Sequence, residues 1–203
     1  MDKLAHWIVE NIDREFQLDA DKREQVEFGL KCLLTLLLSY TLIIVSSWVL
    51  GLFPGALIVA GALGLLRSFS GGAHASTSLR CAVIAIMYTN SLAYLAQVLS
   101  RLEPLWLHIF VVGVAGVGLG LLLKFAPVDV PEKPITDPMH RKRLQWLSVV
   151  SFLVAILISL AVESQYSYAI LLGLCWQLLS LTPAGELLAR LLDQGLGYVL
   201  GGR

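Results

Sequence analysis

The fold is decided by an uncharged run, LLTLLLSYTLIIVSSWVLGLF at Leu33–Phe53. A helix needs about 20 apolar residues to cross the hydrocarbon core of a bilayer, so this run is long enough to span it. Further apolar stretches with charged borders follow at Gly55–Leu66, Cys81–Leu99, Pro104–Leu123, Leu144–Val162 and Tyr166–Leu181. The pattern predicts an all-α, polytopic integral membrane protein with about six transmembrane helices.

The composition agrees with this class. Apolar residues make up 57% of the chain and charged residues 15%, whereas soluble domains carry about 25% charged residues. The formal net charge is zero, which gives no indication of nucleic-acid binding. Cys32, Cys81 and Cys175 lack the paired spacing of a disulfide framework or a zinc site. Cys32 and Cys175 fall inside apolar runs, where packing is the ordinary explanation of a cysteine.

The second apolar stretch is short for a span. Gly55–Leu66 would rise only about 18 Å as a helix, against a hydrocarbon core of about 30 Å. It is therefore either re-entrant or extended over residues 54–69, with Arg67 reaching the interface. If it crosses, every Lys and Arg except Arg101 lies on one side of the membrane. The positive-inside rule favours crossing, which predicts six spans with both termini cytoplasmic.

The two ends of the chain differ from the spans. Met1–Phe16 has no signal-peptide core, and its apolar residues recur at helical spacing opposite charged ones. This predicts an amphipathic helix that lies either on the inner leaflet or on the protein's own cytoplasmic face. Asp19 or Asp21 is expected to cap the helix that follows. We predict one domain over 1–203, made of a cytoplasmic helical region at 1–30, a transmembrane bundle at 31–182 and a cytoplasmic or interfacial tail at 183–203.

A polar stretch, RSFSGGAHASTSLRC at Arg67–Cys81, separates the second and third apolar runs. Ionisable groups next to membrane segments are costly, which favours a functional interpretation. His74 and Cys81 are the minimum for catalysis by a thiol with imidazole as its base. Packing for Cys81, solvation for His74 and a hinge at Gly71-Gly72 are the ordinary structural alternatives. A metal site would need more ligands than one His and one Cys.

A working pair requires a break in the chain. On one unbroken helix, His74 and Cys81 would stand about 10.5 Å apart along the axis. Gly71-Gly72 favours a turn, and Ser76, Thr77 and Ser78 are all natural N-caps of a new helix. With Ser78 as the cap, Leu79 would be the first helical residue. Cys81 would then lie in the first turn, where the helix dipole and Arg80 favour negative charge on the sulfur.

The polar stretch resembles the signature of the accessory gene regulator B (AgrB) family of membrane-embedded cysteine endopeptidases. The matching positions are Arg67, Gly71, Gly72, His74 and Cys81. The family's central cytoplasmic loop is similar to Ala126–Asp129, Lys133–Ile135 and the basic Arg141–Arg143. Chain length and six hydrophobic segments fit as well, so the resemblance covers nearly the whole chain.

The resemblance implies that His74 and Cys81 are the catalytic pair of a cysteine endopeptidase in a bacterial cell membrane, at its cytoplasmic side. The implied substrate is an AgrD-like quorum-sensing precursor, whose C-terminal tail is cleaved through a Cys81 thioester before a thiolactone or lactone ring closes. No metal or cofactor is expected. Residues expected to bind the substrate are Arg67, Gly72, Arg80, Lys133, Arg141, Lys142 and Arg143.

Two alternatives stay open. The basic loop, which includes His140, either captures an acidic precursor tail or sets topology and attracts lipid head groups. A non-enzymatic small transporter or assembly subunit is the competing function. Its support is a glycine-rich fourth span, which suits close helix packing and a possible homodimer, with glycines at Gly113, Gly116, Gly118 and Gly120.

Overall fold

The computed structural model describes residues 2–16, 19–73, 75–129 and 135–199. These residues form eight helices and no strand, which confirms the predicted all-α fold. In chain order the helices are α1 (Asp2–Phe16), α2 (Ala20–Val49), α3 (Phe53–Ser70), α4 (Ser78–Leu99), α5 (Pro104–Phe125), α6 (Pro138–Ala161), α7 (Ser164–Ser180) and α8 (Pro183–Val199).

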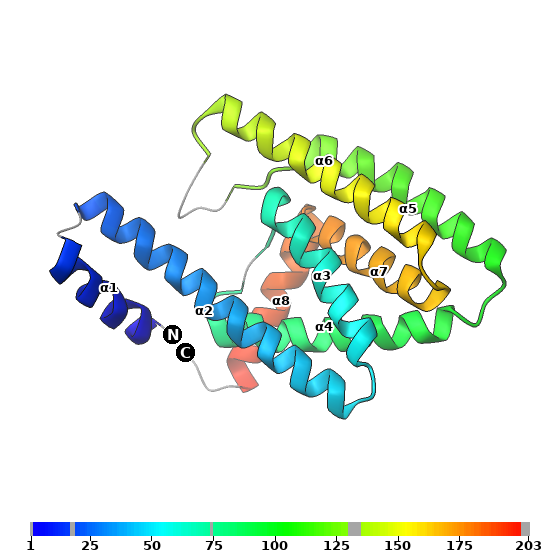
Figure 1. Cartoon of the computed structure of the whole chain (residues 1–203), viewed down its shortest axis with the longest axis horizontal. Coiled ribbons are helices and arrows are strands. Elements are labelled where there is room, and N and C mark those ends of the chain that lie inside the picture. The colour runs from blue at the N-terminus through cyan, green and yellow to red at the C-terminus, as the bar shows by residue number, and fades with distance from the viewer. Residues whose placement is uncertain (1, 17–18, 74, 130–134, 200–203) are drawn as a thin grey trace.

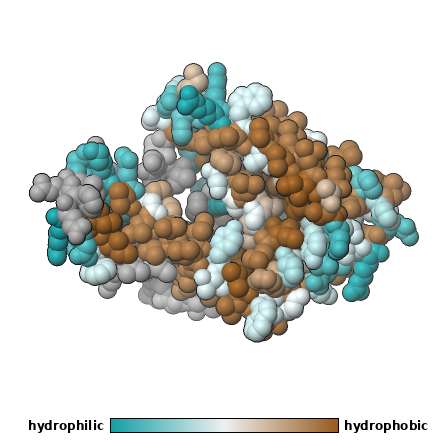
Figure 2. All heavy atoms as spheres, in the orientation of Figure 1, coloured by the Kyte–Doolittle hydropathy of each residue, from teal (hydrophilic) through white to brown (hydrophobic). Residues whose placement is uncertain are grey.

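Five of these helices, α2 to α6, are long and apolar enough to cross a membrane. Helices α7 and α8 meet at 91°, and this bent pair would make a sixth span that is either broken or re-entrant. Large apolar side chains are exposed on the outer faces, for example Trp48 at 75% and Val112 at 72%. Figure 2 shows hydrophobic residues along α2, α5 and α6 and hydrophilic residues gathered toward the helix ends. The predicted set of about six spans is thus confirmed.

Helix α3 has the length that the extended alternative for the short second stretch requires. It runs without a break from Phe53 to Ser70 and has 18 residues, with Arg67 in its last turn. Pro54 lies in the first turn, where its missing N–H removes no helical hydrogen bond. The resulting rise of about 27 Å is close to the thickness of a bilayer core.

Helix α7 lies at the centre of the bundle, with α3, α4, α5 and α6 packed against it (Figure 1). Leu171 and Leu174 are fully buried there and belong to the main apolar core. Because α7 contacts these four helices and also α8, the position of its last turn determines which loops can meet at that end of the bundle.

One end of the bundle collects the loops after α3, α5 and α7 together with the first turns of α4 and α6 (Figure 1). Two backbone hydrogen bonds join these loops. The N–H of Val128 donates to the Ser70 carbonyl at 2.9 Å, and the N–H of Ala73 donates to the Ser180 carbonyl at 3.4 Å. The polar stretch therefore lies at the same end as the start of the basic loop.

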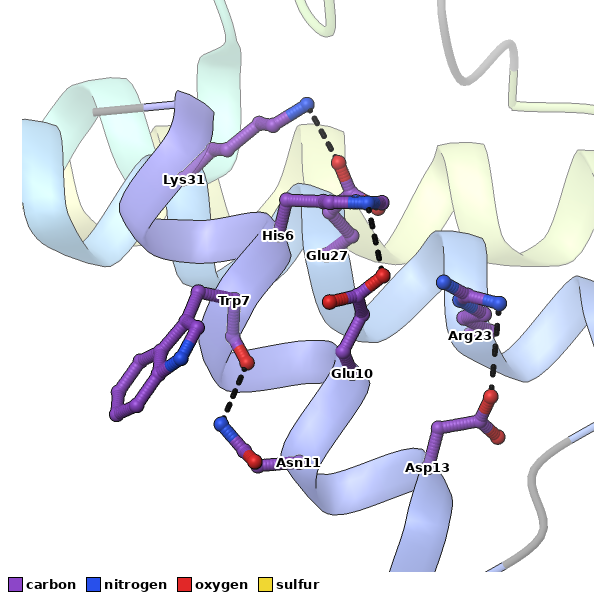
Figure 3. Close-up of polar contacts among 8 residues, drawn as sticks. All are labelled: His6, Trp7, Glu10, Asn11, Asp13, Arg23, Glu27 and Lys31. Carbon is purple, nitrogen blue, oxygen red and sulfur yellow. Dashed lines mark hydrogen bonds and ion pairs between the residues drawn. The ribbon is translucent and has the colours of Figure 1, made fainter.

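Helix α1 packs against the N-terminal part of α2 through Ala5 and Val9, which are fully buried. The His6 ring lies 3.5 Å from the Glu27 carboxylate of α2. Figure 3 shows His6 of α1 beside Glu27. Trp7 points away from these contacts and is 62% exposed (Figure 3). The helix thus packs on the protein itself, as one of the two predicted interpretations requires, and it keeps an exposed aromatic side chain.

Asp19 is the N-cap of α2, and it is one of the two residues predicted for this role. Its carboxylate accepts a hydrogen bond from the Lys22 N–H at 2.9 Å. This backbone hydrogen bond, together with the Lys22 ammonium 3.0 Å away, lowers the pKa of Asp19. An ion pair between Arg23 and Asp13, 3.5 Å long, joins α2 to α1 (Figure 3).

Candidate active site

The predicted break in the chain is a turn at Gly71-Gly72. Gly71 ends α3 with φ 68° and Gly72 follows with φ 140°, both in the region that favours glycine. A Cβ at Gly71 would lie 2.5 Å from the Val128 carbonyl oxygen, and one at Gly72 would lie 2.7 Å from the Ser180 hydroxyl. The turn therefore requires glycine for its backbone conformation and for the close approach of its neighbours.

Gln177 of α7 holds this turn in place. Its side chain is fully buried, and Nε2 donates to the Gly71 carbonyl at 2.7 Å and to the Ser70 hydroxyl at 2.9 Å. Its Oε1 accepts from the Ser180 hydroxyl at 3.2 Å. Gln177 is not among the residues predicted from the sequence, although a lone amide inside the apolar run Tyr166–Leu181 was an available signal.

Arg67 is turned back onto the polar stretch rather than outward. Its Nη2 donates to the Ala73 carbonyl. The Arg67 side chain is half-buried and lines a cavity that it shares with Cys81. The guanidinium thus holds the segment before α4 and also presents positive charge to the cavity.

Thr77 is the N-cap of α4, which is one of the three residues that the sequence offers for this role, whereas Ser78 is the first residue of the helix. Thr77 has extended φ and ψ of −135° and 149°, and its hydroxyl accepts from the Arg80 N–H at 3.3 Å. The Ser78 hydroxyl instead accepts a hydrogen bond from Thr35 of α2 at 2.7 Å. Cys81 still lies at the start of the helix, where its N–H donates to the Thr77 carbonyl at 2.9 Å.

A cavity of about 100 Å³ lies beside Cys81. Helices α3, α4, α7 and α8 contribute to its lining, which includes Arg67, Cys81, Tyr88, Trp176, Ser180 and Leu192. Tyr88 stacks on Trp176 with ring centroids 4.9 Å apart, so it both packs and lines the cavity. His74 lies outside the described residues, but Ala73 and Ala75 on either side of it line this cavity.

The other residues expected to bind substrate have separate surroundings. Gly72 is buried in the turn, whereas Arg80 faces α8, where its Nη1 lies 3.6 Å from the Asp193 carboxylate. Lys133 lies outside the described residues. Arg141 pairs with Asp129, and the remaining basic residues of the patch are exposed at His140, Lys142 and Arg143.

The three cysteines are all free thiols, and they occupy different positions. Cys32 is exposed on α2, Cys175 packs partly buried against the core, and Cys81 alone lines the cavity described above. Among the residues that the structure describes, no group of three His, Cys, Asp or Glu side chains could hold a metal ion.

Comparison with known proteins gives a consistent result. The profile of the family Accessory gene regulator B matches residues 1–181. An AgrB-like protein of Clostridium perfringens strain 13 is 26% identical over 95% of this chain and 96% of its own length. Accessory gene regulator protein B of Staphylococcus aureus strain MRSA252 is 26% identical over 85% of this chain and 89% of its own length. No solved structure matches. The family profile covers the chain from its first residue to the end of α7, which includes three of the four helices that line the Cys81 cavity. This chain therefore belongs to the accessory gene regulator B family.

Proposed function

We propose that this protein is a membrane cysteine endopeptidase that cleaves the C-terminal tail of an AgrD-like quorum-sensing precursor. Membership of the family supports a role in accessory gene regulator quorum sensing. One observation carries the finer proposal: Cys81 lines a cavity at the first turn of α4, and the residues that flank His74 line the same cavity.

In this mechanism the Cys81 sulfur attacks a peptide carbonyl of the precursor. His74 takes the thiol proton and later gives it to the amine that leaves with the tail. The carbonyl carbon stays bound to sulfur as a thioester. A thiol or hydroxyl of the same peptide then attacks this thioester, which frees Cys81 and closes a thiolactone or lactone ring.

The tetrahedral intermediate carries an oxyanion that needs donors. The first backbone N–H groups of a helix have no partner within it, so those of Ser78 and Leu79 are the donors that we assign to this role. Arg67, which lines the Cys81 cavity, adds a positive charge there.

Ring closure competes with hydrolysis of the thioester. Formation of a thiolactone from the Cys81 thioester exchanges one thioester for another and is nearly isoenergetic. Hydrolysis of the Cys81 thioester would instead release a linear peptide and prevent ring closure. The cavity lining is mostly apolar, with side chains such as Ile84, Leu188 and Leu192, and this favours the attack by the peptide nucleophile over attack by water.

We assign the end of the bundle that carries Cys81 to the cytoplasm, with both termini on that side. The support is the distribution of charge: the basic residues Lys142 and Arg143 lie at this end, and Arg101 lies at the other. The exposed basic patch, formed by His140, Arg141, Lys142 and Arg143, is then placed to attract an acidic precursor tail.

The test is co-expression with an AgrD-like precursor, followed by mass spectrometry of the peptide products. Cys81→Ala and His74→Ala should each abolish cleavage while membrane insertion is retained, because nucleophile and base act as one unit. Cys32→Ala and Cys175→Ala are matched controls and should cleave normally. Cleavage by the Cys81→Ala variant at the wild-type rate would refute the mechanism.

A further inference from the structure

Helix α8 follows the segment matched by the family profile, which ends at residue 181. It leaves α7 at 91° and passes the N-terminal end of α4, as Figure 1 shows. Its side chains Leu188, Ala189 and Leu192 line the cavity beside Cys81. Part of the wall of the candidate site is therefore built by a helix that the sequence analysis placed in an interfacial tail.

A polar network fastens α8 to the chain segment in front of Cys81. The Asp193 Oδ1 accepts from the Ser76 N–H at 3.2 Å and from the Ser76 hydroxyl at 3.0 Å. The same oxygen lies 3.6 Å from Arg80 Nη1, which donates to the Ser76 hydroxyl at 3.0 Å. The Asp193 and Arg80 side chains are only 18% and 14% exposed, so this ion pair is partly shielded from water.

A larger groove of about 540 Å³ continues from the Cys81 cavity. The two spaces share lining residues from three helices, namely Ile84, Tyr88, Trp176, Leu188 and Leu192. The groove wall is almost entirely apolar, and its volume lies in the range of pockets that enclose a small ligand. An apolar side chain reaching the groove from Cys81 would lose its contact with water.

The acyl group bound to Cys81 determines what can enter this groove. In the thioester the Cα of the residue before the cleaved bond is separated from sulfur by the carbonyl carbon alone. Its side chain must therefore lie within a few ångström of the sulfur, whichever way the rest of the peptide runs. Leu188 and Leu192 form part of the wall of the same cavity that Cys81 lines.

We propose that α8 forms a specificity subsite for an apolar side chain on the residue before the cleaved bond, and that Asp193 is the positioning residue that holds this wall against Ser76 and Arg80. This proposal rests on the peptidase function proposed above. The ligand is an aliphatic or aromatic peptide side chain, and Leu192 controls how large it can be.

The first experiment uses the full chain in phospholipid vesicles and precursor peptides with Ala, Leu or Phe before the cleaved bond. The wild type should prefer Leu or Phe to Ala in kcat/KM. Leu192→Phe should shift this preference toward Ala by about tenfold or more, because a difference of one methylene group in an apolar pocket changes the ratio of kcat/KM values by about tenfold or more. Leu187→Phe is the control, because Leu187 lies on the same helix, is 59% exposed and lines neither space.

The second experiment tests Asp193. Asp193→Ala should lower the preference for Phe over Ala at least fivefold, mainly through KM, and Asp193→Glu should restore part of it. Glu186→Gln is the control, because Glu186 pairs with Arg190 on the exposed side of the same helix. A purely structural role of Asp193 would reduce turnover of all three peptides by the same factor.

The outcomes separate the two proposals. If the wild type cleaves none of the peptides, the peptidase function itself is refuted. If the wild type cleaves but Leu192→Phe and Asp193→Ala slow all peptides equally, the groove holds something other than the substrate side chain, such as a lipid acyl chain. That result would overturn the specificity subsite and leave the peptidase function intact.

Discussion

Gln177 is the buried polar residue that joins the core of the bundle to the candidate site. Replacement by Leu keeps the approximate volume but removes the two hydrogen bonds donated to Ser70 and Gly71. Each buried acceptor left without its donor costs about 1–3 kcal/mol. We therefore expect Gln177→Leu to lower the unfolding temperature in detergent and to slow precursor cleavage. Gln97→Leu, near the far end of α4, should change neither quantity.

Single residues differ in how well the sequence alone predicts them. Arg67 and Cys81 were identified because they stand out in a polar stretch between apolar runs, and the structure brings both to one cavity. Gln177 was missed because its role depends on the glycine turn, which lies 106 residues earlier in the chain. Thr77 could not be singled out among the candidate caps Ser76, Thr77 and Ser78 because all three are suitable caps in isolation. In the structure, Thr35 of the neighbouring helix engages the Ser78 hydroxyl.

At the scale of elements, the glycine turn connects α3 to α4, and its conformation sets the direction in which α4 starts. Gly71→Ala places a Cβ against the Val128 backbone, which cannot move aside as a flexible side chain can. We expect this variant to insert but to lose most of its cleavage activity, with a destabilisation of about 1–3 kcal/mol from backbone strain.

The matched control for that prediction is Gly113→Ala in α5, where a Cβ would meet nothing within 4 Å. Alanine is the better helix former by about 0.5–1 kcal/mol, so this variant should be at least as stable as the wild type. Peptide turnover and unfolding temperature, measured for both variants, check the prediction. Equal activity of the two variants would show that the turn tolerates a side chain.

Helix number was predictable because a membrane span needs only length and apolar composition. The mutual arrangement was not, because the apolar runs resemble one another and nothing in their composition marks α7 as the central helix. The glycine-rich span illustrates the difficulty: Gly118 packs closely on Phe152 and Leu178, whereas Gly113, Gly116 and Gly120 face open space. The contact of α8 with α4 was equally unpredictable, since Asp193 looks like any charged residue of an amphipathic helix.

At the scale of the whole molecule, the two ends of the bundle must face opposite sides of the membrane. Met139 at the start of α6 and Leu102 between α4 and α5 are 60% and 48% exposed, at opposite ends. Single cysteines at these positions, in a background without the native thiols, should react from opposite sides with an impermeant reagent. We expect only Leu102→Cys to be labelled in intact cells. Labelling of both would contradict the proposed orientation.

The basic patch also concerns the whole molecule, because its exposed charges create an electrostatic field at one end of the bundle. Arg141 is engaged by Asp129, so the double variant Lys142→Gln and Arg143→Gln removes exposed charge without breaking that pair. If the patch captures an acidic tail, Kd for the precursor should rise about tenfold at low salt. The effect should shrink as salt rises, because charges are screened over about 8–10 Å.

The control for this prediction is Arg190→Gln, an exposed cation of α8 that pairs with Glu186 on its own helix. It should leave precursor binding unchanged. If the double variant inserts correctly and binds the precursor with unchanged Kd and salt dependence, tail capture by the patch is refuted. The patch would then serve membrane topology alone.

The length of α7 has a consequence for the membrane itself. Its 17 residues rise about 25 Å, whereas a typical hydrocarbon core is about 30 Å thick. Because the Gly71 turn is attached to the last turn of α7, either Cys81 sits several ångström below the head groups or the bilayer thins to meet it. If Cys81 carries out the proposed cleavage, acyl-chain length becomes a control on that reaction, and a bacterium that remodels its lipids with temperature would adjust its output of signal peptide at the same time.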